Sequence, residues 1–371
     1  MRSFIKKTLA VLLSAMLLLS AVPITAMAAE TTAQECVGAS SGTTGDCTWT
    51  LDDDGLLTIS GNGAMADYGF CGPWGDKIKN VVIESGVTAI GKEAFSGCTS
   101  LVSVTIGDSV TSIGNFAFRY CTSLVGVTIP DSVTSIGTGA FHGCTSLASV
   151  TIPDSVTSIG AGAFEVCAGL ESLTVDANNT VYDSRNNCNA VIETGSNTLI
   201  AGCKNTVIPN DVTTVGEDAF FGCTSLTSVT IPDSVTSIGD FAFCGCTSLA
   251  SVTIPDSVTS IGFEAFGYLN YGSKAEGFTI YGKPGSEAEA YANENGFIFI
   301  SDEYTVTTGD VSGDSKVDIT DATLVQQFAA ELIELDENQK KAADTNKDGK
   351  VDIDDATLIQ KFVAELIKSF D

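Results

Sequence analysis

Residues 124–146 read LVGVTIPDSVTSIGTGAFHGCTS, and the same pattern returns along much of the chain. Further copies begin at Leu101, Leu147, Leu226 and Leu249, the last of them shortened. Within each run of copies, the starting points lie 23 residues apart. A period of this length predicts a solenoid, in which stacked repeats complete one another's core.

Apolar residues fall at positions 1, 4, 6, 10, 13, 17, 18 and 21 of the unit. Positions 4 to 6 predict a short strand, the Pro-Asp pair a turn, and VTSIG a second short strand. Eight buried side chains contribute about 1.5–3 kcal/mol each, whereas ordering each backbone residue costs about 1–2 kcal/mol. A lone repeat is therefore unstable, and we expect a mainly β repeat solenoid with capping units.

The string VTIPDSVTSIGxxAFxxCTSL resembles the BspA-type leucine-rich repeat over about residues 36–300. This resemblance implies a secreted or surface protein that binds proteins or glycans and has no catalytic chemistry. We expect a β cap at 36–80, repeats at 81–277, and a closing unit at 278–300. In the closing unit a short helix from Ser286 should lie between two strands. Residues 171–203 break the period and predict an enlarged unit with an extra hairpin.

The first 28 residues read as a secretory signal peptide, with cations before a short apolar run and a small-residue cleavage site. Without its three cations, the formal net charge of −28 becomes 15 − 46 = −31. Such an acidic surface excludes nucleic acid as a partner. No later stretch is long enough to span a membrane, so we expect no membrane insertion and an extracellular protein.

Catalytic groups do not converge in the sequence. The only histidine, His142, occupies a position that holds Arg119, Glu165 or Cys244 in other copies, so we expect an ordinary exposed side chain. The GASSG match at 38–42 lacks the strand, helix and histidine of a nucleophile elbow. Asp52, Asp53 and Asp54 fit a polar hairpin turn. The sequence therefore predicts no enzyme.

The chain has twelve cysteines, and six recur at repeat position 21. Stacked repeats would align these six as an internal ladder of buried thiols: Cys98, Cys121, Cys144, Cys167, Cys223 and Cys246. The alternative is disulfide formation, for which Cys36–Cys47 and Cys188–Cys203 are the better candidates. The spacings do not fit zinc.

Aspartates recur at repeat position 8, and five of them should form a surface ladder: Asp108, Asp131, Asp154, Asp233 and Asp256. They are either turn residues or an acidic stripe that contacts a basic partner or cations. Exposed Ser and Thr beside the strands suit recognition by hydrogen bonds. Large exposed aromatic residues for stacking on sugars are not evident.

Two aspartate-rich loops occupy the C-terminal part, DVSGDSKVDITD at 310–321 and DTNKDGKVDIDD at 344–355. Both place oxygen ligands at loop positions 1, 3, 5 and 12, with a carbonyl at position 7 and a water-mediated ligand at position 9. The sequence predicts two Ca²⁺ ions, held by Asp310, Ser312, Asp314, Lys316, Asp318, Asp321, Asp344, Asn346, Asp348, Lys350, Asp352 and Asp355.

After a linker at 301–308, residues 309–371 resemble a type I-like dockerin, a small all-α calcium-binding module. Aspartate rather than glutamate at position 12, and extended sequence before the first loop, separate it from an EF-hand sensor. The resemblance implies a cohesin domain of a scaffoldin as partner. The cohesin-facing residues it implies are Ile319, Thr320, Gln326, Gln327, Ile353, Asp354, Gln360 and Lys361. Ser315 replaces the usual glycine at position 6 and predicts a weaker first site.

Two functions fit these features. In the first, the dockerin attaches a non-catalytic protein to a scaffoldin, as in a cellulosome that degrades polysaccharide, and the solenoid presents a protein- or glycan-binding surface. In the second, the solenoid is an adhesin for host or microbial ligands and the dockerin only anchors it. A hydrolase is the weakest alternative because no general acid and base converge.

Overall fold

The computed structural model describes residues 40–270, 272–301, 307–313, 316–335 and 337–370. The predicted signal peptide, Cys36 and the first two residues of the GASSG segment lie outside these residues. The chain divides into two compact units between Phe164 and Glu165.

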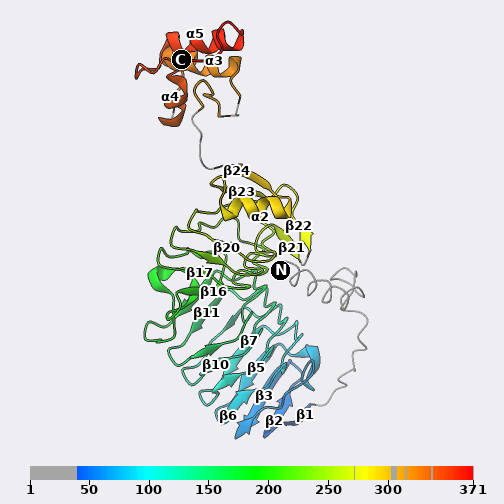
Figure 1. Ribbon diagram of the computed structural model, residues 1–371. Helices are drawn as coiled ribbons and strands as arrows, with labels where there is room; N and C mark the ends of the chain where they lie inside the picture. The colour runs from blue at the N-terminus through cyan, green and yellow to red at the C-terminus, as the bar shows by residue number, and fades with distance from the viewer. Residues whose placement is uncertain (1–39, 271, 302–306, 314–315, 336, 371) are drawn as a thin grey trace, which may run out of the picture. The chain divides into compact units, whose positions relative to one another are not determined.

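The first unit is a stack of short strands in two sheets (Figure 1). One sheet has the order β1-β2-β3-β5-β7-β9, which comprises Ser41–Thr44, Cys47–Leu51, Leu56–Gly61, Asn80–Ile83, Ser103–Ile106 and Gly126–Val127. The other has the order β12-β10-β8-β6-β4, which comprises Ser158–Ile159, Ser135–Ile136, Ser112–Ile113, Val87–Ile90 and Gly63–Ala64. The short helix η1 (Gly75–Lys77) and strand β11 (Ser149–Ile152) complete the unit.

The second unit continues the same architecture and adds the irregular elements. One sheet has the order β14-β15-β16-β17-β18-β20, which comprises Tyr182–Asp183, Ala190–Glu193, Thr198–Gly202, Thr214–Val215, Ser237–Ile238 and Ser260–Ile261. Smaller sheets join β19-β23-β24 (Ser251–Thr253, Thr279–Gly282, Ile298–Ser301) and β21-β22 (Tyr268–Asn270, Ser273–Lys274). The remaining elements are β13 (Ser172–Val175), η2 (Arg185–Asn187), α2 (Glu287–Asn295), α3 (Ile319–Ala329), α4 (Glu337–Ala343) and α5 (Ile353–Val363).

The sequence period sets the strand register. Ser135 pairs in parallel with Ser112 on one side and with Ser158 on the other, and Ser237 pairs with Ser260 in the same way. Each pair is one period apart, so identical side chains lie next to each other in the stack. The predicted solenoid and its second strand, VTSIG, are therefore confirmed.

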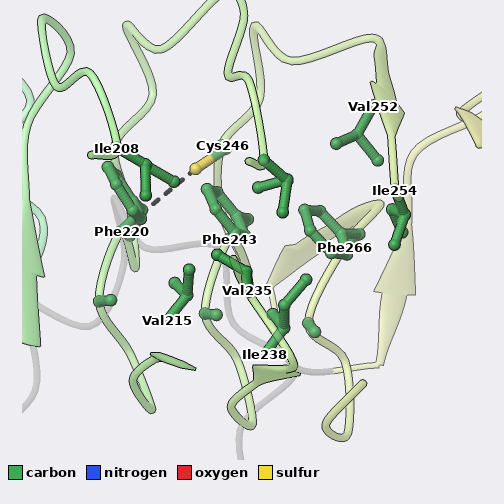
Figure 2. Packing of buried hydrophobic residues seen from close by; sticks show 14 of the residues in the cluster. Ile208, Val215, Phe220, Val235, Ile238, Phe243, Cys246, Val252, Ile254 and Phe266 are labelled. Carbon is green, nitrogen blue, oxygen red and sulfur yellow. Dashed lines mark hydrogen bonds between the residues drawn. The ribbon is translucent and has the colours of Figure 1, made fainter. Parts of the chain in front are cut away.

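The core consists of ladders formed by this register. The Phe95, Phe118 and Phe141 rings stack nearly parallel in the first unit, with centroids 5.1 and 5.3 Å apart. In the second unit, Phe220, Phe243 and Phe266 stack at 4.7 and 4.6 Å (Figure 2). Such ring contacts add to the free energy gained by burying the rings.

The position-21 cysteines form the predicted buried ladder beside the phenylalanines. All six are buried, and several thiols donate to a main-chain carbonyl of a neighbouring repeat. Cys121 donates to the Phe95 oxygen (3.1 Å), and Cys246 donates to the Phe220 oxygen (3.3 Å, Figure 2). Burial raises the pKa of Cys144 to about 12, so this thiol is not reactive at neutral pH.

Both predicted caps are present. At the N-terminal end, β2 and β3 form the expected hairpin, and the Asp52 carboxylate accepts the Asp54 and Leu56 amides in its turn. At the C-terminal end, α2 begins after Ser286 and lies between β23 and β24 in sequence, as predicted. Its Tyr291 hydroxyl bonds both the amide and the carbonyl of Phe266 (2.9 and 3.0 Å), which closes the last rung.

The extra hairpin predicted in the enlarged unit is β15–β16, which pair antiparallel. The adjacent Arg185 guanidinium forms ion pairs with Asp183 (2.7 Å) and Asp211 (2.9 Å). The Cys188–Cys203 disulfide prediction is wrong. Both residues are buried thiols, because Cys203 is directed to the Asn189 oxygen (3.3 Å) and Cys188 to the Ala190 oxygen (3.9 Å).

Two further expectations need correction. The copy at Leu226 has no first strand, and the preceding rung at 203–209 is likewise turn and coil. His142 is half-buried rather than exposed, because its ring packs against the Tyr120 ring at 5.3 Å between centroids.

The loop around the AF motif has a fixed left-handed geometry at repeat positions 16 and 20. Gly139 and Gly143 have φ values of 58° and 75° there, and Phe116 and Tyr120 have 56° and 58° at the same positions one repeat earlier. Glycine adopts this region without strain, whereas a side chain costs roughly 1–2 kcal/mol. The stack therefore imposes this backbone whether or not glycine is present.

Asp218 occupies the same left-handed position in the second unit, with a φ of 57°. It is half-buried, and burial raises the pKa of its carboxyl to about 7, helped by repulsion from Glu165, Glu217 and Asp240. Between about pH 4 and pH 7, the folded state therefore keeps a proton on Asp218 that the unfolded chain has released. Stability at this site is therefore lost as the pH rises from about 4 to 7.

We expect Asp218→Asn to stabilise the protein at pH 8 by about 1 kcal/mol, discounted for solvent screening, or roughly 2–4 °C in melting temperature. At pH 4 the carboxyl is protonated in the folded state, so the variant and the native chain should melt together. Thermal unfolding at both pH values measures the difference. An equal gain at the two values would contradict the assignment.

Candidate functional site

The C-terminal helices form a small module with near-two-fold internal symmetry. The helix α3 buries Ala322 and Val325 fully. Their counterparts 34 residues later, Ala356 and Ile359 of α5, are also fully buried. These residues belong to one apolar cluster: Val311, Ala322, Val325, Leu335, Ala342, Ala343, Ala356 and Ile359. The two loop–helix segments therefore share one core.

The helix α4 ends directly before the second loop and was not anticipated from the sequence. Its seven residues, ENQKKAA, carry no apolar period, although most favour helix. The buried Ala342 and Ala343 attach its last turn to the shared core. Before the first loop, the described residues 307–309 form no helix.

Loop positions 9 and 12 begin each helix. Asp318 and Asp352 are the N-caps of α3 and α5, and each forms a reciprocal capping box with the aspartate three residues later. Asp321 is fully buried, and its second oxygen accepts the Ser312 amide (2.7 Å). Asp355 accepts the Thr345 and Asn346 amides (2.9 and 3.2 Å) in the same way. Position 12 thus connects the loop to its helix.

Asp310, Asp344 and Asp348 bond main-chain amides of their own loops. Asp310 accepts the Gly313 amide (2.9 Å), and Asp344 accepts those of Asp348 and Gly349 (3.1 and 3.0 Å). Gly349, at loop position 6, has a φ of 83°, which suits the sharp turn that a calcium loop needs.

The described residues do not place three Asp, Glu, His or Cys side chains at metal-ligand separation. Asp314 and Ser315 of the first loop lie outside the described residues. The oxygen donors on each loop, the turn at Gly349 and the buried position-12 carboxylates are the chemistry that a hard cation requires.

The residues implied to face a partner are mostly at the surface. Ile319 and Ile353 are equivalent and are 55% and 53% exposed, which is unusual for isoleucine. Thr320, Asp354 and Lys361 are exposed, and Gln326, Gln327 and Gln360 are half-buried. Leu332 and Leu366, each 74% exposed, form a second equivalent pair. This pair was not predicted, although the sequence AELI repeats at the end of each helix and marks it.

The two ends of the module meet through Phe370. Its ring stacks on Phe362, with centroids 4.8 Å apart. It also lies against Gly309, where an added Cβ would come within 2.6 Å of the ring. The C-terminal segment therefore closes over the residue that precedes the first loop.

The repeat surface carries the predicted aspartate ladder, whose five members are all exposed. Asp108 accepts the Ser85 hydroxyl (2.7 Å), and Asp256 pairs with Lys283 (2.9 Å). The expectation that no large aromatics are exposed is wrong. Tyr120 and Phe263 are 43% and 55% exposed, and Tyr120 occupies the left-handed position 20 of its repeat.

Comparison with known proteins fits this architecture. The family described as BspA type Leucine rich repeat region matches residues 65–190 and 199–276, in six copies. This is more than half of the chain. The protein belongs to the BspA-type leucine-rich repeat family. Dockerin type I domain matches residues 308–364, which identifies the two-loop module as a dockerin. No curated protein matches.

Solved structures with related folds are also leucine-rich repeat proteins. The protein from Eubacterium ventriosum is 31% identical over 66% of this chain and 73% of its own, with a TM-score of 0.52. Those from T. pallidum and Bacteroides ovatus are 27% and 23% identical, with TM-scores of 0.36 and 0.40. The T. pallidum match covers 56% of this BspA-type chain and 90% of the T. pallidum chain. The Bacteroides ovatus match covers 64% of this chain and 70% of the other.

The two matching families also indicate general properties of this BspA-type protein. Both are non-catalytic in general, and no enzyme family matches. Type I dockerins bind calcium in general, and proteins with these two domains are typically extracellular or on the cell surface. No helix among the described residues is long and apolar enough to cross a membrane.

We expect Phe370→Ala to destabilise the dockerin by about 2–4 kcal/mol, because a large apolar ring is removed from a packed site. Calorimetry on the intact chain should show the dockerin transition at a lower temperature while the solenoid transition stays in place. If both transitions move together, or neither does, the ring does not close the module.

Proposed function

We propose that this protein is a secreted, non-catalytic component of an extracellular complex. Its dockerin docks onto a cohesin domain of a scaffoldin, and its solenoid presents a surface that binds a protein or a glycan. The observation that carries the proposal is the dockerin itself, with two calcium-type loops on helices related by near-two-fold symmetry. Residues 1–28 act as the secretion signal.

Two Ca²⁺ ions bind in this proposal, one in each loop. Asp310, Ser312, Asp314, Asp318 and Asp321 supply oxygens in the first loop, and the Lys316 carbonyl completes the set. The second set is Asp344, Asn346, Asp348, the Lys350 carbonyl, Asp352 and Asp355. Bound calcium neutralises the clustered carboxylates and fixes each loop against its helix, so it supplies folding free energy.

The docking surface lies at the start and middle of α3 and α5. Ile319, Thr320, Gln326 and Gln327 serve one orientation, and Ile353, Asp354, Gln360 and Lys361 serve the other. The equal exposure of Ile319 and Ile353 supports two related binding modes. The modes differ in strength, because Thr320 is matched by Asp354 and Gln327 by Lys361.

In a pull-down of the full chain on a cohesin panel, we expect binding with calcium and loss of binding with a chelator. Ile319→Asp and Ile353→Asp should each weaken binding by less than about tenfold, because the other face remains, whereas the double variant should lose more than about a hundredfold. The matched control is Val207→Asp, which changes an exposed apolar residue of the repeats.

Two results would contradict the docking model. Binding that survives chelation would exclude a calcium-folded docking surface. Complete loss in either single isoleucine variant would exclude two usable faces.

Ser315→Gly should strengthen the first calcium site, because glycine adopts the sharp turn at loop position 6 without strain. Isothermal titration should show the weaker of two calcium affinities rise about three- to tenfold, towards that of the loop with Gly349. No change in the weaker affinity would contradict this expectation.

A further inference from the structure

Phe116, Arg119 and Tyr120 form a compact cluster on one AF loop of the first unit. The Arg119 guanidinium lies over the Tyr120 ring at 4.6 Å and over the Phe116 ring at 5.4 Å. It donates to the Tyr120 hydroxyl (3.4 Å), and His142 of the next repeat meets the Tyr120 ring at 5.3 Å between centroids. Two aromatic rings therefore hold the guanidinium in place.

The two rings occupy positions where the backbone favours glycine. Phe116 and Tyr120 are left-handed, and the next repeat has Gly139 and Gly143 at the same positions. A Cβ at either glycine would come within 2.4 Å of Phe116 or 2.3 Å of Tyr120, so each ring rests directly on glycine backbone. Tyr120 is in addition 43% exposed, so a residue in a strained conformation presents part of its aromatic ring at the surface.

Arg119 has no carboxylate partner among the described residues. Arg185 shows the contrast, since it pairs with Asp183 and Asp211. The chain has 46 acidic and 18 basic residues, so Arg119 is not unpaired for want of carboxylates in the protein. One guanidinium N–H is used by the Tyr120 hydroxyl, and the remaining N–H groups suit a carboxylate on a ligand.

We propose that this cluster, the Arg119 clamp, binds a carboxylate-bearing sugar on a mostly neutral polysaccharide. A net charge of −28 disfavours a polyanion, but an isolated carboxylate meets only the local field of Arg119. Asn115, next to Phe116 in sequence, is exposed, and its side-chain amide suits a sugar hydroxyl. A protein interface needs a large apolar centre, and the clamp offers mainly the 43% exposed ring of Tyr120.

The clamp deepens the proposed function and rests on it, because it assigns a ligand class to the recognition surface of the repeats. The test is titration of the full chain with three probes: glucuronoxylan, the same xylan freed of its glucuronate branches, and a poly-glutamate peptide. We expect binding to glucuronoxylan alone. Arg119→Gln should weaken it about ten- to hundredfold, and Arg119→Lys should restore it only in part, because lysine keeps the charge without the fork.

Tyr120→Gly separates recognition from folding. It installs the residue found at this position in the next repeat, so the melting temperature should stay or rise while glucuronoxylan binding falls at least about tenfold. The matched control is Val166→Gly, which replaces another left-handed side chain at repeat position 20. It should affect melting in the same direction and leave binding unchanged.

Equal binding to the uronate-free xylan, undiminished binding by Arg119→Gln, or no binding to glucuronoxylan would overturn the proposal. Binding to the peptide instead would assign the clamp to an acidic protein and overturn the glycan class. Cohesin capture is measured on the same samples. Its failure would reject the docking role alone, and the two proposals can therefore fail separately.

Discussion

The rest of the structure depends on the in-register stacking of a 23-residue unit. Ser135 faces Ser112 and Ser158, and this register brings each phenylalanine of the core next to its counterpart. The contacts within one repeat do not offset the conformational entropy that its ordering costs. Its strands, loops and buried thiols are therefore stable only when neighbouring repeats pack against them. The ends need caps for the same reason, and Tyr291 provides one by bonding both main-chain groups of Phe266.

The stack explains why one loop can carry unusual side chains. The backbone at repeat positions 16 and 20 is held by hydrogen bonds to the adjacent rungs, such as Phe116 N–H to the Thr138 oxygen and Tyr120 N–H to the His142 oxygen. Neighbouring repeats thus fix the left-handed geometry and absorb the strain of a side chain there. Side chains can therefore vary at these positions while the core ladders stay constant.

Much of this organisation was predictable from the sequence because it follows from periodicity. The solenoid, the hairpin cap, the enlarged unit and the two aspartate loops all repeat or interrupt a clear pattern. The sequence could not predict what depends on neighbours. The copy at Leu226 lacks its first strand, and the rung before it is also coil. The helix α4 is too short to show a helical period. Tyr120 has a left-handed backbone that could not be predicted from its residue type, because the next repeat has glycine at this position. In the dockerin, the sequence predicted which residue types supply the calcium ligands. It did not predict that Leu332 and Leu366 are exposed, because apolar residues after a helix are usually buried.

The hairpin β15–β16 has a consequence for how the chain finds its fold. The copies that begin at Leu124 and Leu226 share the run VTIPDSVTSIG, so either could pair with the wrong neighbour at little loss of core contacts. The enlarged unit interrupts the period once, and it holds the β15–β16 hairpin and the ion pairs that Arg185 forms with Asp183 and Asp211. A chain that slipped by one unit would leave this segment without its partners. The enlarged unit therefore makes one alignment of the near-identical repeats more stable than the alternatives.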